Sequence, residues 1–331
     1  MPEVNAREKL LEIKGLKVNF YTKRGVVHAV RDLELSIDKG ETLALVGESG
    51  CGKSVTAHAI NQLIPSPGKI EGGEILFDGR NLLAMTEREV RRYRGERISM
   101  IFQEPMTSLN PVFKVGHQIA DILMTHQALA RKAALRRAVE LLDLVKIPTP
   151  ERRAHAYPHQ LSGGMRQRVM IAMALASPSP GLLIADEPTT ALDVTIQAQI
   201  LDLLNELQNR IRLSILLITH DLGVVAENAQ RVIVMYAGRK VEEGELTSVL
   251  KNPGHPYTQG LLNSLPSNPK YANAHRLEAI KGTVPDMITV GDGCPFANRC
   301  PHVREICWDN FPAARILGND QRAWCHFAGE I

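Results

Sequence analysis

The stretch that decides the fold is Gly47-Glu48-Ser49-Gly50-Cys51-Gly52-Lys53-Ser54, which directly follows the apolar run 43–46. It satisfies the pattern of a phosphate-binding loop, in which Gly, four residues, Gly and Lys precede Ser or Thr. Glycines let successive backbone N–H groups turn toward phosphate oxygens, and the helix expected from Lys53 adds the positive end of its dipole. We expect Lys53 to reach the β- and γ-phosphates of a nucleotide, Ser54 to ligate Mg²⁺ and Cys51 to fill space in the loop.

The segments on both sides of this loop predict strands that alternate with helices. Residues 10–46 alternate apolar and polar side chains, which indicates short strands followed by a more buried one. The apolar face of a helix is expected over 195–209. Further strands are expected at 74–77, 97–102, 182–185, 215–218 and 232–236. This alternation predicts an α/β fold with a parallel sheet covered by helices.

Two changes in pattern indicate the domain organisation. A mostly helical insert is expected between about 116 and 177, with helices at 116–127, 131–146 and 163–177 separated by turns that contain proline. Pro, Gly and Asn become frequent after about residue 252, where we place a domain boundary.

Adjacent carboxylates close a second apolar strand, Leu182-Leu183-Ile184-Ala185-Asp186-Glu187. Ionised carboxylates beside a buried strand are costly without a cation, and the metal of a bound nucleotide supplies one. We expect Asp186 to hold this metal through water and Glu187 to accept a proton from an attacking water molecule. A strand that simply ends in solvated acids is the alternative.

A second anion-binding feature is Leu161-Ser162-Gly163-Gly164-Met165, at the start of the helix expected over 163–177. A hydroxyl and two glycine amides at a helix N-terminus suit a negatively charged group, although an ordinary helix cap uses the same residues. The stretch lies far from Ser54 along the chain, beyond the helical insert. We therefore expect Ser162, Gly163 and Gly164 to serve the nucleotide of another subunit.

In this order the motifs resemble those of the ATP-binding cassette (ABC) family: the phosphate loop, the LSGG stretch, the LLIADE strand, the turn 190–193, and Gln103 and His220 after strands. The resemblance covers about residues 10–250. It implies a P-loop (RecA-like) core with an antiparallel β subdomain and an inserted helical subdomain at about 104–178. It also implies that two cassettes close head to tail on ATP.

The same resemblance implies roles for single residues. Gln103 ligates Mg²⁺ and senses a membrane partner, and Glu187 polarises the attacking water. His220 contacts the γ-phosphate, and Asp193 couples the two sites across the dimer. Either Phe20 or Tyr21, near the end of the first strand, stacks on adenine. One position departs from the family pattern, because Met165 stands where Gln is most frequent.

Three further segments are similar to the dipeptide and oligopeptide importer branch of this family, most of all to its D-type ATPase subunits. They are FQEPMTSLNP at 102–111, His159-Gln160, and GHPYTQ at 254–259. The resemblance then spans an ABC nucleotide-binding domain at 1–251 and the branch's C-terminal domain at 252–331. It implies an Mg²⁺-dependent ATPase on the cytoplasmic face of the inner membrane. Its implied partners are a second, homologous ATPase, two transmembrane permeases and a periplasmic or extracellular substrate-binding protein.

Composition limits the alternatives. A formal net charge of +3 on 331 residues gives no electrostatic argument for a nucleic-acid partner. The longest apolar run, 169–176, is shorter than the roughly 20 residues that span a bilayer. The N-terminal residues show no signal-peptide pattern, so a reducing cytosol is expected. Importers of nickel, glutathione or haem remain alternatives to peptide import, and a soluble ABC ATPase outside transport is a further one.

The C-terminal residues carry four of the five cysteines, Cys294, Cys300, Cys307 and Cys325. Clustered thiols in a cytosolic chain favour a metal site. Members of the importer branch can hold a [4Fe–4S] cluster on such a tail, which we favour over zinc and over unliganded thiols, because the paired spacing of structural zinc sites is missing. We expect aromatic residues to shield the cluster: Phe296, Trp308, Phe311, Trp324 and Phe327.

Overall fold

The computed structural model describes residues 8–104, 108–190, 192–265, 279–318 and 320–331. It divides the chain into two compact units, each built from separate stretches of sequence. The helical unit comprises Met1–Leu10, Asp38–Glu41 and Ala84–Leu217. The P-loop unit comprises Leu11–Ile37, Thr42–Leu83 and Ile218–Ile331. Parts of two predicted features, 105–107 of the proline-rich loop and Ala191 of the turn 190–193, lie outside the described residues.

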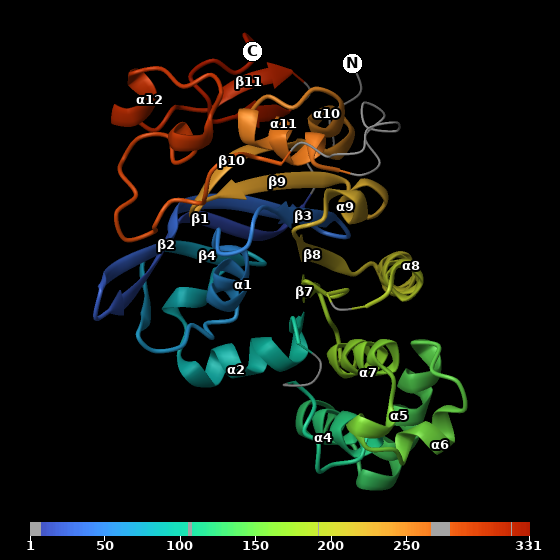
Figure 1. The fold of residues 1–331 in the computed structure, drawn as a ribbon. Helices are drawn as coiled ribbons and strands as arrows, with labels where there is room; N and C mark the ends of the chain where they lie inside the picture. Colours follow the sequence, from blue (N-terminus) through green and yellow to red (C-terminus); the bar gives the residue numbers. More distant parts are fainter. Residues whose placement is uncertain (1–7, 105–107, 191, 266–278, 319) are drawn as a thin grey trace, which may run out of the picture. The chain divides into compact units, whose positions relative to one another are not determined.

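One sheet of the P-loop unit has the strand order β2-β1-β4-β5 (Figure 1). Its strands are β1 (Lys9–Thr22), β2 (Gly25–Asp38), β4 (Gly68–Phe77) and β5 (Arg80–Asn81). The sequence predicted short strands here, but β1 and β2 each have 14 residues. A turn at Lys23 and Arg24 separates the two strands, and there the Thr22 hydroxyl donates to the Gly25 carbonyl and accepts the N–H of Arg24.

A second set of strands in this unit has the order β11-β12-β10-β9-β3. Strands β3 and β9 are parallel, with Leu43 opposite Arg231, and β10 continues antiparallel to both β9 and β12. The strands are β3 (Thr42–Val46), β9 (Arg231–Tyr236), β10 (Arg239–Glu245), β11 (Arg315–Gly318) and β12 (Gln321–Ala323). The helices are α1 (Lys53–Ile60), α9 (Leu222–Asn228), α10 (Leu246–Lys251), α11 (Pro256–Asn263) and α12 (Ile306–Asp309), with short 3₁₀ turns at Leu82–Ala84 and Ala297–Arg299.

The core of this unit joins the strand before the phosphate loop to the C-terminal residues. Val46 of β3, Tyr236 of β9 and Tyr257 of α11 belong to one buried cluster, and Phe296 of the cysteine-rich segment belongs to it as well. The Phe296 ring lies 5.2 Å from that of Tyr236 and 5.4 Å from that of Tyr257. Burying a Phe side chain stabilises a fold by about 2–3 kcal/mol, so the C-terminal segment contributes to the core beneath the loop.

In the helical unit the strand order is β8-β7-β6, and the predicted parallel pairing is confirmed for β6 and β7. The strands are β6 (Ile98–Ile101), β7 (Leu182–Asp186) and β8 (Ser214–Thr219), the last of which crosses the boundary between the units. The helices are α2 (Glu87–Glu96), α4 (Val115–Gln127), α5 (Arg131–Leu144), α6 (Pro150–Ala154), α7 (Gly163–Leu175) and α8 (Val194–Ile211), with a 3₁₀ turn at Pro158–Gln160. The predicted helices at 116–127, 131–146, 163–177 and 195–209 are therefore present.

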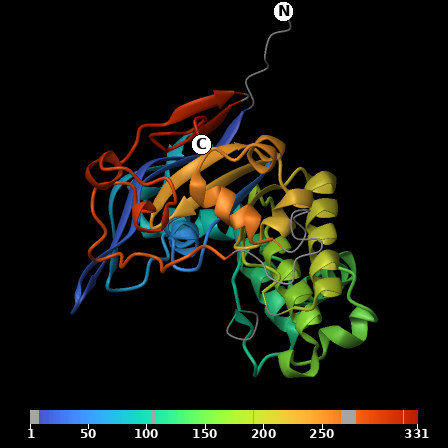
Figure 2. The ribbon, with the colours of Figure 1, turned by 45° about the horizontal axis from the view of Figure 1, so that its top comes forward.

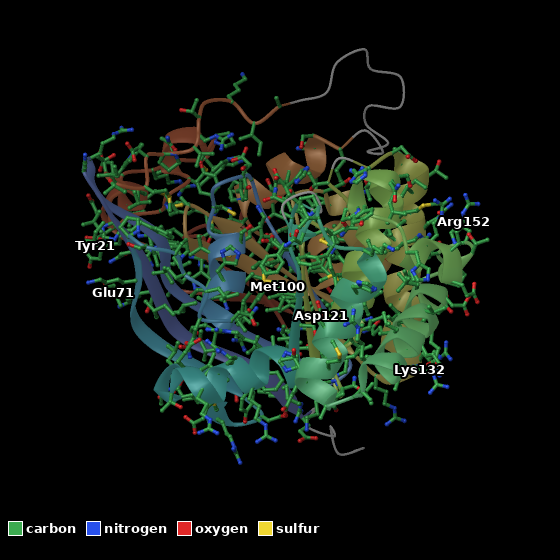
Figure 3. The ribbon with its side chains drawn as sticks, turned by 90° about the horizontal axis from the view of Figure 1, so that it is seen from below. Tyr21, Glu71, Met100, Asp121, Lys132 and Arg152 are labelled. Carbon is green, nitrogen blue, oxygen red and sulfur yellow. The ribbon has the colours of Figure 1, made fainter. Side chains whose placement is uncertain are left out.

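Helices α4 to α7 pack against one another, and Figure 2 shows them gathered in green. Ala134, Ala138, Leu141 and Leu142 give α5 a continuous buried face, because they recur at helical spacing. Charged side chains lie on the opposite surfaces: Figure 3 shows Lys132 at the periphery of this unit, and Arg152 likewise. Among the described residues, none of the helices combines the length and the apolar character that crossing a bilayer requires.

Candidate nucleotide-binding site

The phosphate loop links β3 to α1 through a backbone that only glycine adopts without strain. Gly47, Gly50 and Gly52 have φ values of 155°, 80° and 103°. A Cβ atom on Gly47 would lie 2.2 Å from the carbonyl oxygen of Met235, and one on Gly52 would lie 2.4 Å from that of Ala29. Gly47 and Gly52 are therefore required both by backbone conformation and by the close approach of the neighbouring chain, whereas Gly50 is required by its conformation alone.

Lys53, the first residue of α1, turns its ammonium group into this loop. Its Nζ atom donates to the carbonyl oxygens of Gly47, at 2.7 Å, and Glu48, at 3.1 Å, and the residue is only 4% exposed. Cys51 lies beside it with its Sγ 3.8 Å from Nζ, and burial raises the pKa of this thiol. The loop thus holds one buried cation and a neutral thiol at the N-terminus of a helix, an arrangement that suits a phosphate group.

The two carboxylates predicted from the LLIADE stretch lie at the end of β7, in the helical unit. Asp186 is the last residue of that strand and is 2% exposed. Glu187 follows with a φ of 46°, which is uncommon for a residue other than glycine. Its Oε2 atom accepts hydrogen bonds from Gln103 Nε2, at 2.9 Å, and from Thr190 Oγ1, at 2.8 Å. Gln103 follows β6, the parallel neighbour of β7, so the structure brings together two predicted site residues from different strands.

Ser162 caps α7 as predicted from the LSGG stretch. Its hydroxyl accepts the backbone N–H of Met165 at 3.3 Å, and Ser162 and Gly163 are exposed. A Cβ atom on Gly164 would lie 2.6 Å from Cγ2 of Ile196 in α8, so a larger residue there would displace one helix from the other. Replacing Gln by Met at 165 leaves the backbone of the cap intact, because only its N–H is used.

Asp193 caps α8, where its side chain accepts the N–H of Ile196 at 3.0 Å and remains exposed. The next residue, Val194, is 83% exposed.

The remaining predicted residues belong to the P-loop unit. His220 follows β8 and is exposed, directly before Asp221, which caps α9. Phe20 is half-buried near Gly68 and Ile64, whereas Tyr21 is 45% exposed and donates from its hydroxyl to Glu71 at 2.7 Å (Figure 3). Each unit thus carries part of the predicted set. The P-loop unit holds Phe20, Tyr21, Gly47 to Ser54 and His220, and the helical unit holds Gln103, Ser162 to Gly164, Asp186, Glu187 and Asp193.

Three residues at the site were not predicted from the sequence. Thr190 orients Glu187, and Tyr257 and Arg299 bind Glu48 in the phosphate loop. The segment GHPYTQ had been singled out, but a motif does not reveal which group a tyrosine hydroxyl contacts. Arg299 lies outside all of the motifs described above.

The four C-terminal cysteines line one small cavity together with His302 and His326. The N–H of His302 points to Sγ of Cys300, and that of Phe327 to Sγ of Cys325, each at 3.4 Å. Burial raises the pKa of Cys294 to about 12. Within the part of the chain that the structure describes, no three His, Cys, Asp or Glu side chains converge closely enough to hold a single metal ion.

The predicted aromatic shell is only partly correct. Phe296 and Phe327 line the thiol cavity. Trp308 is 56% exposed, Phe311 lies under Arg239, and Trp324 lies under Lys240. Phe311 and Trp324 thus pack against cationic side chains, whose stems pack favourably on aromatic faces, and none of these three rings lines the thiol cavity.

Similarity to known families agrees with this geometry. Residues 30–190 match the ABC transporter family. A solved dimeric structure of the ATP-binding cassette MJ0796 with ADP and Pi superposes with a TM-score of 0.65 at 29% identity, over 72% of this chain and 99% of that one. Fold and site together define an ATPase of the ABC class.

Relatives of similar length narrow the class. Residues 241–307 match the C-terminal region of oligopeptide/dipeptide transporters. The chain is 54% identical to an oligopeptide transport ATP-binding protein of Bacillus subtilis (strain 168), over 92% of this chain and 85% of the relative. It is 49% identical to a dipeptide transport ATP-binding protein of the same organism, over 96% and 94%. The chain belongs to the family of peptide ABC transporter ATP-binding proteins.

Proposed function

We propose that this chain hydrolyses ATP to energise a bacterial importer of dipeptides and oligopeptides. The observation that carries the hydrolytic part is the Glu187 carboxylate, held at the end of β7 by Gln103 and Thr190. The peptide substrate is supported by the printed descriptions of the relatives from Bacillus subtilis and Salmonella typhimurium, which are peptide transport ATP-binding proteins.

ATP binding begins at the phosphate loop. Backbone N–H groups of Gly47 to Ser54 and the N-terminus of α1 bind phosphate oxygens. Lys53 exchanges its contacts with the loop carbonyls for the β- and γ-phosphates. Ser54, Gln103 and Asp186 would hold Mg²⁺, which would neutralise negative charge on the phosphates when bound.

In the proposed hydrolysis, Glu187 acts as the base. The carboxylate accepts a proton from a water molecule whose oxygen forms a bond to the γ-phosphorus. The bond between that phosphorus and the β–γ bridging oxygen breaks, so ADP and phosphate form and no other reactant is needed. Lys53 and His220 stabilise the negative charge that spreads over the γ-phosphoryl oxygens.

A second cassette completes the site. The exposed cap formed by Ser162, Gly163 and Gly164 contacts the ATP of the partner, and Asp193 links the two sites. The dimeric cassette structure at 29% identity supports this arrangement. We propose that the partner is a different, homologous ATPase. The pair docks from the cytoplasmic face of the inner membrane on two permeases, to which a periplasmic or extracellular binding protein delivers the substrate.

Phe20 is the better placed of the two aromatic residues for adenine. It shares the buried face of β1 with Val18, and its ring lies near Ile64, a few residues beyond α1, whereas Tyr21 lies on the exposed face. We therefore assign the stacking role to Phe20. A larger loss of affinity for a fluorescent ATP analogue in Tyr21→Ala than in Phe20→Ala would reverse this assignment.

We also propose the domain division 1–251 and 252–331, with a helical subdomain at about 104–178. The family matches at 30–190 and 241–307 support two functional segments. Helices α4 to α7 support the inserted subdomain.

We propose a [4Fe–4S] cluster rather than zinc at the four cysteines, whose thiols line one small cavity. The N–H groups directed at Cys300 and Cys325 are the contacts that iron–sulfur thiolates accept. Bound to the four cysteines, the cluster would cross-link separate segments of the C-terminal region. Protein purified without oxygen should be brown and bleach on reduction, and colourless protein with stoichiometric zinc would refute the cluster.

The decisive test of hydrolysis is Glu187→Gln, measured in the full chain with its partner ATPase. Removing the proton acceptor should lower kcat by about 10²–10⁴-fold while ATP still binds. Glu227→Gln is the matched control, because Glu227 is an exposed acid of α9 outside the site. Normal turnover in Glu187→Gln would show that another group accepts the proton.

The substrate is tested by uptake in a strain that lacks this chain. Restored uptake of labelled dipeptides or oligopeptides by the wild type, and not by Glu187→Gln, is the expected result. Uptake of nickel, glutathione or haem instead would assign the chain to a related importer, and no transport defect would favour a soluble ABC ATPase.

A further inference from the structure

Glu48, the second residue of the phosphate loop, is held from outside the loop by two C-terminal residues. Its backbone N–H donates to the Tyr257 hydroxyl at 2.7 Å. Its carboxylate receives two parallel hydrogen bonds from Arg299, from Nη1 to Oε2 at 2.6 Å and from Nη2 to Oε1 at 3.1 Å. A paired guanidinium and carboxylate of this geometry is stronger and more directional than a single contact.

Arg299 is itself fixed. Its side chain is 4% exposed, compared with 28% for that of Glu48. The remaining donors reach the carbonyl oxygens of Lys281, at 3.0 Å, and Ile280, at 3.3 Å, and the hydroxyl of Tyr236 at 3.1 Å. The N–H groups of the guanidinium are therefore paired with acceptors, and these contacts hold the group in one position.

The pairing of Arg299 with Glu48 compensates a negative charge in the phosphate loop. A carboxylate next to the backbone that binds triphosphate repels it, and in a partly buried site this repulsion is only weakly screened. Arg299 draws the Glu48 carboxylate toward itself and compensates its charge. The contact with Glu48 in turn raises the pKa of Arg299 above its usual range, so the arginine stays charged.

We propose that Arg299 is a positioning residue of the phosphate loop, which neutralises Glu48 and thereby makes ATP affinity depend on the thiol-lined C-terminal region. This rests on the proposed ATPase function. The link is short: Arg299 ends the turn Ala297–Arg299, directly before Cys300. The N–H of Cys294 bonds the carbonyl of Cys307 at 2.8 Å, so the segment that carries Arg299 is anchored to the wall of the thiol cavity.

The test is a double-mutant cycle on ATP affinity, measured by calorimetry with Mg²⁺–ATP on the full chain. Arg299→Met should weaken binding about tenfold, because it leaves an uncompensated carboxylate beside the phosphates. In a Glu48→Gln background the same substitution should cost less than about threefold, since no charge remains to compensate. Arg299→Lys should recover part of the affinity. Arg315→Met is the matched control, an arginine of the same region that pairs with Glu330.

The thiol cavity gives the second arm. The variant Cys307→Ser/Cys325→Ser should weaken ATP binding about three- to tenfold in the wild-type background and less than about twofold beside Glu48→Gln. Equal losses in both backgrounds, for either arm, would mean a purely structural effect and would overturn the proposal. So would an unchanged affinity in Arg299→Met.

This failure is distinguishable from failure of the proposed function. If the chain were not an ATPase, the wild type would bind no ATP or would turn it over no faster than Glu187→Gln. If only the Arg299 proposal were wrong, wild type and Arg299→Met would bind ATP alike and hydrolyse it alike.

Discussion

Glu48 and Glu187 each follow a buried strand, β3 in the P-loop unit and β7 in the helical unit, yet their carboxylates are held by different chemistry. Glu48 faces the guanidinium of Arg299, which supplies two charged donors. Glu187 faces the amide of Gln103 and the hydroxyl of Thr190, which are neutral.

The two carboxylates thus differ in the charge of the groups seen to bind them, and Glu187 is the one that we propose as the proton acceptor. The amide of Gln103 and the hydroxyl of Thr190 fix the direction of the Glu187 oxygens. The backbone also differs at the two positions. The residue before Glu48 is glycine, whereas Glu187 itself adopts a left-handed backbone.

The largest expected effect on the Glu48 side comes from a substitution at Gly47. Gly47→Ala should weaken ATP binding by more than about 100-fold, because its Cβ would meet the Met235 carbonyl at 2.2 Å and displace Glu48 with the loop. Calorimetry measures the loss. Gly79→Ala is the control, since Gly79 also has a positive φ, of 75°, but open space at its Cβ. Equal affinity in both variants would mean that the loop tolerates the shift.

Acid should destabilise the P-loop unit through His255. His255 caps the helix that carries Tyr257, and burial lowers the pKa of His255 to about 3. Below pH 6.5 the unfolded chain gains a proton at His255 that the folded chain refuses, so stability falls with pH until about pH 3. At pH 5 the expected loss, relative to pH 7, is about 2 kcal/mol.

Denaturant unfolding of wild type and His255→Asn at both pH values isolates this effect, because Asn can still cap the helix. The carboxylate of Glu242 works in the opposite sense, since burial raises its pKa and the folded chain then binds a proton more readily, but it is present in both proteins. A wild type no more acid-sensitive than the variant would contradict the role of His255.

The smallest expected effect lies on the Glu187 side. Thr190→Val removes one hydrogen bond to the Glu187 carboxylate and should lower kcat about fivefold. Steady-state kinetics should show KM changing less than kcat for Thr190→Val. A change confined to KM would place Thr190 in ATP binding rather than in orientation of Glu187.

Much of the fold could be predicted because its signals are local. Continuous apolar runs predicted β3, β7 and β9, and helical spacing predicted α5 and α8. Strand β10, with sequence RKVEEGE, reads as an exposed strand. Its Lys240 and Glu242 are nevertheless buried, because Glu243 pairs with the lysine at 2.8 Å and the N–H groups of Gly254 and His255 bind the glutamate. Such compensation depends on distant residues and leaves no pattern.

The candidate site divides in the same manner. The phosphate loop and the β7 carboxylates carry motifs, so their residues could be named in advance, although their roles remain predictions. The pair of Glu48 and Arg299 joins positions 251 apart in sequence. Neither residue type is unusual where it stands, and only the fold brings them together.

The pairing of β12 with β10 has a consequence for how the protein is made. A ribosome delivers Gly47 to Ser54 long before Gln321, whose side chain bonds Glu242 at 2.8 Å and closes the edge of β10. Residues Tyr257 and Arg299 also emerge after the loop that they hold. A nascent chain therefore exposes the phosphate loop before Tyr257 and Arg299, the residues that bind Glu48, have been synthesised.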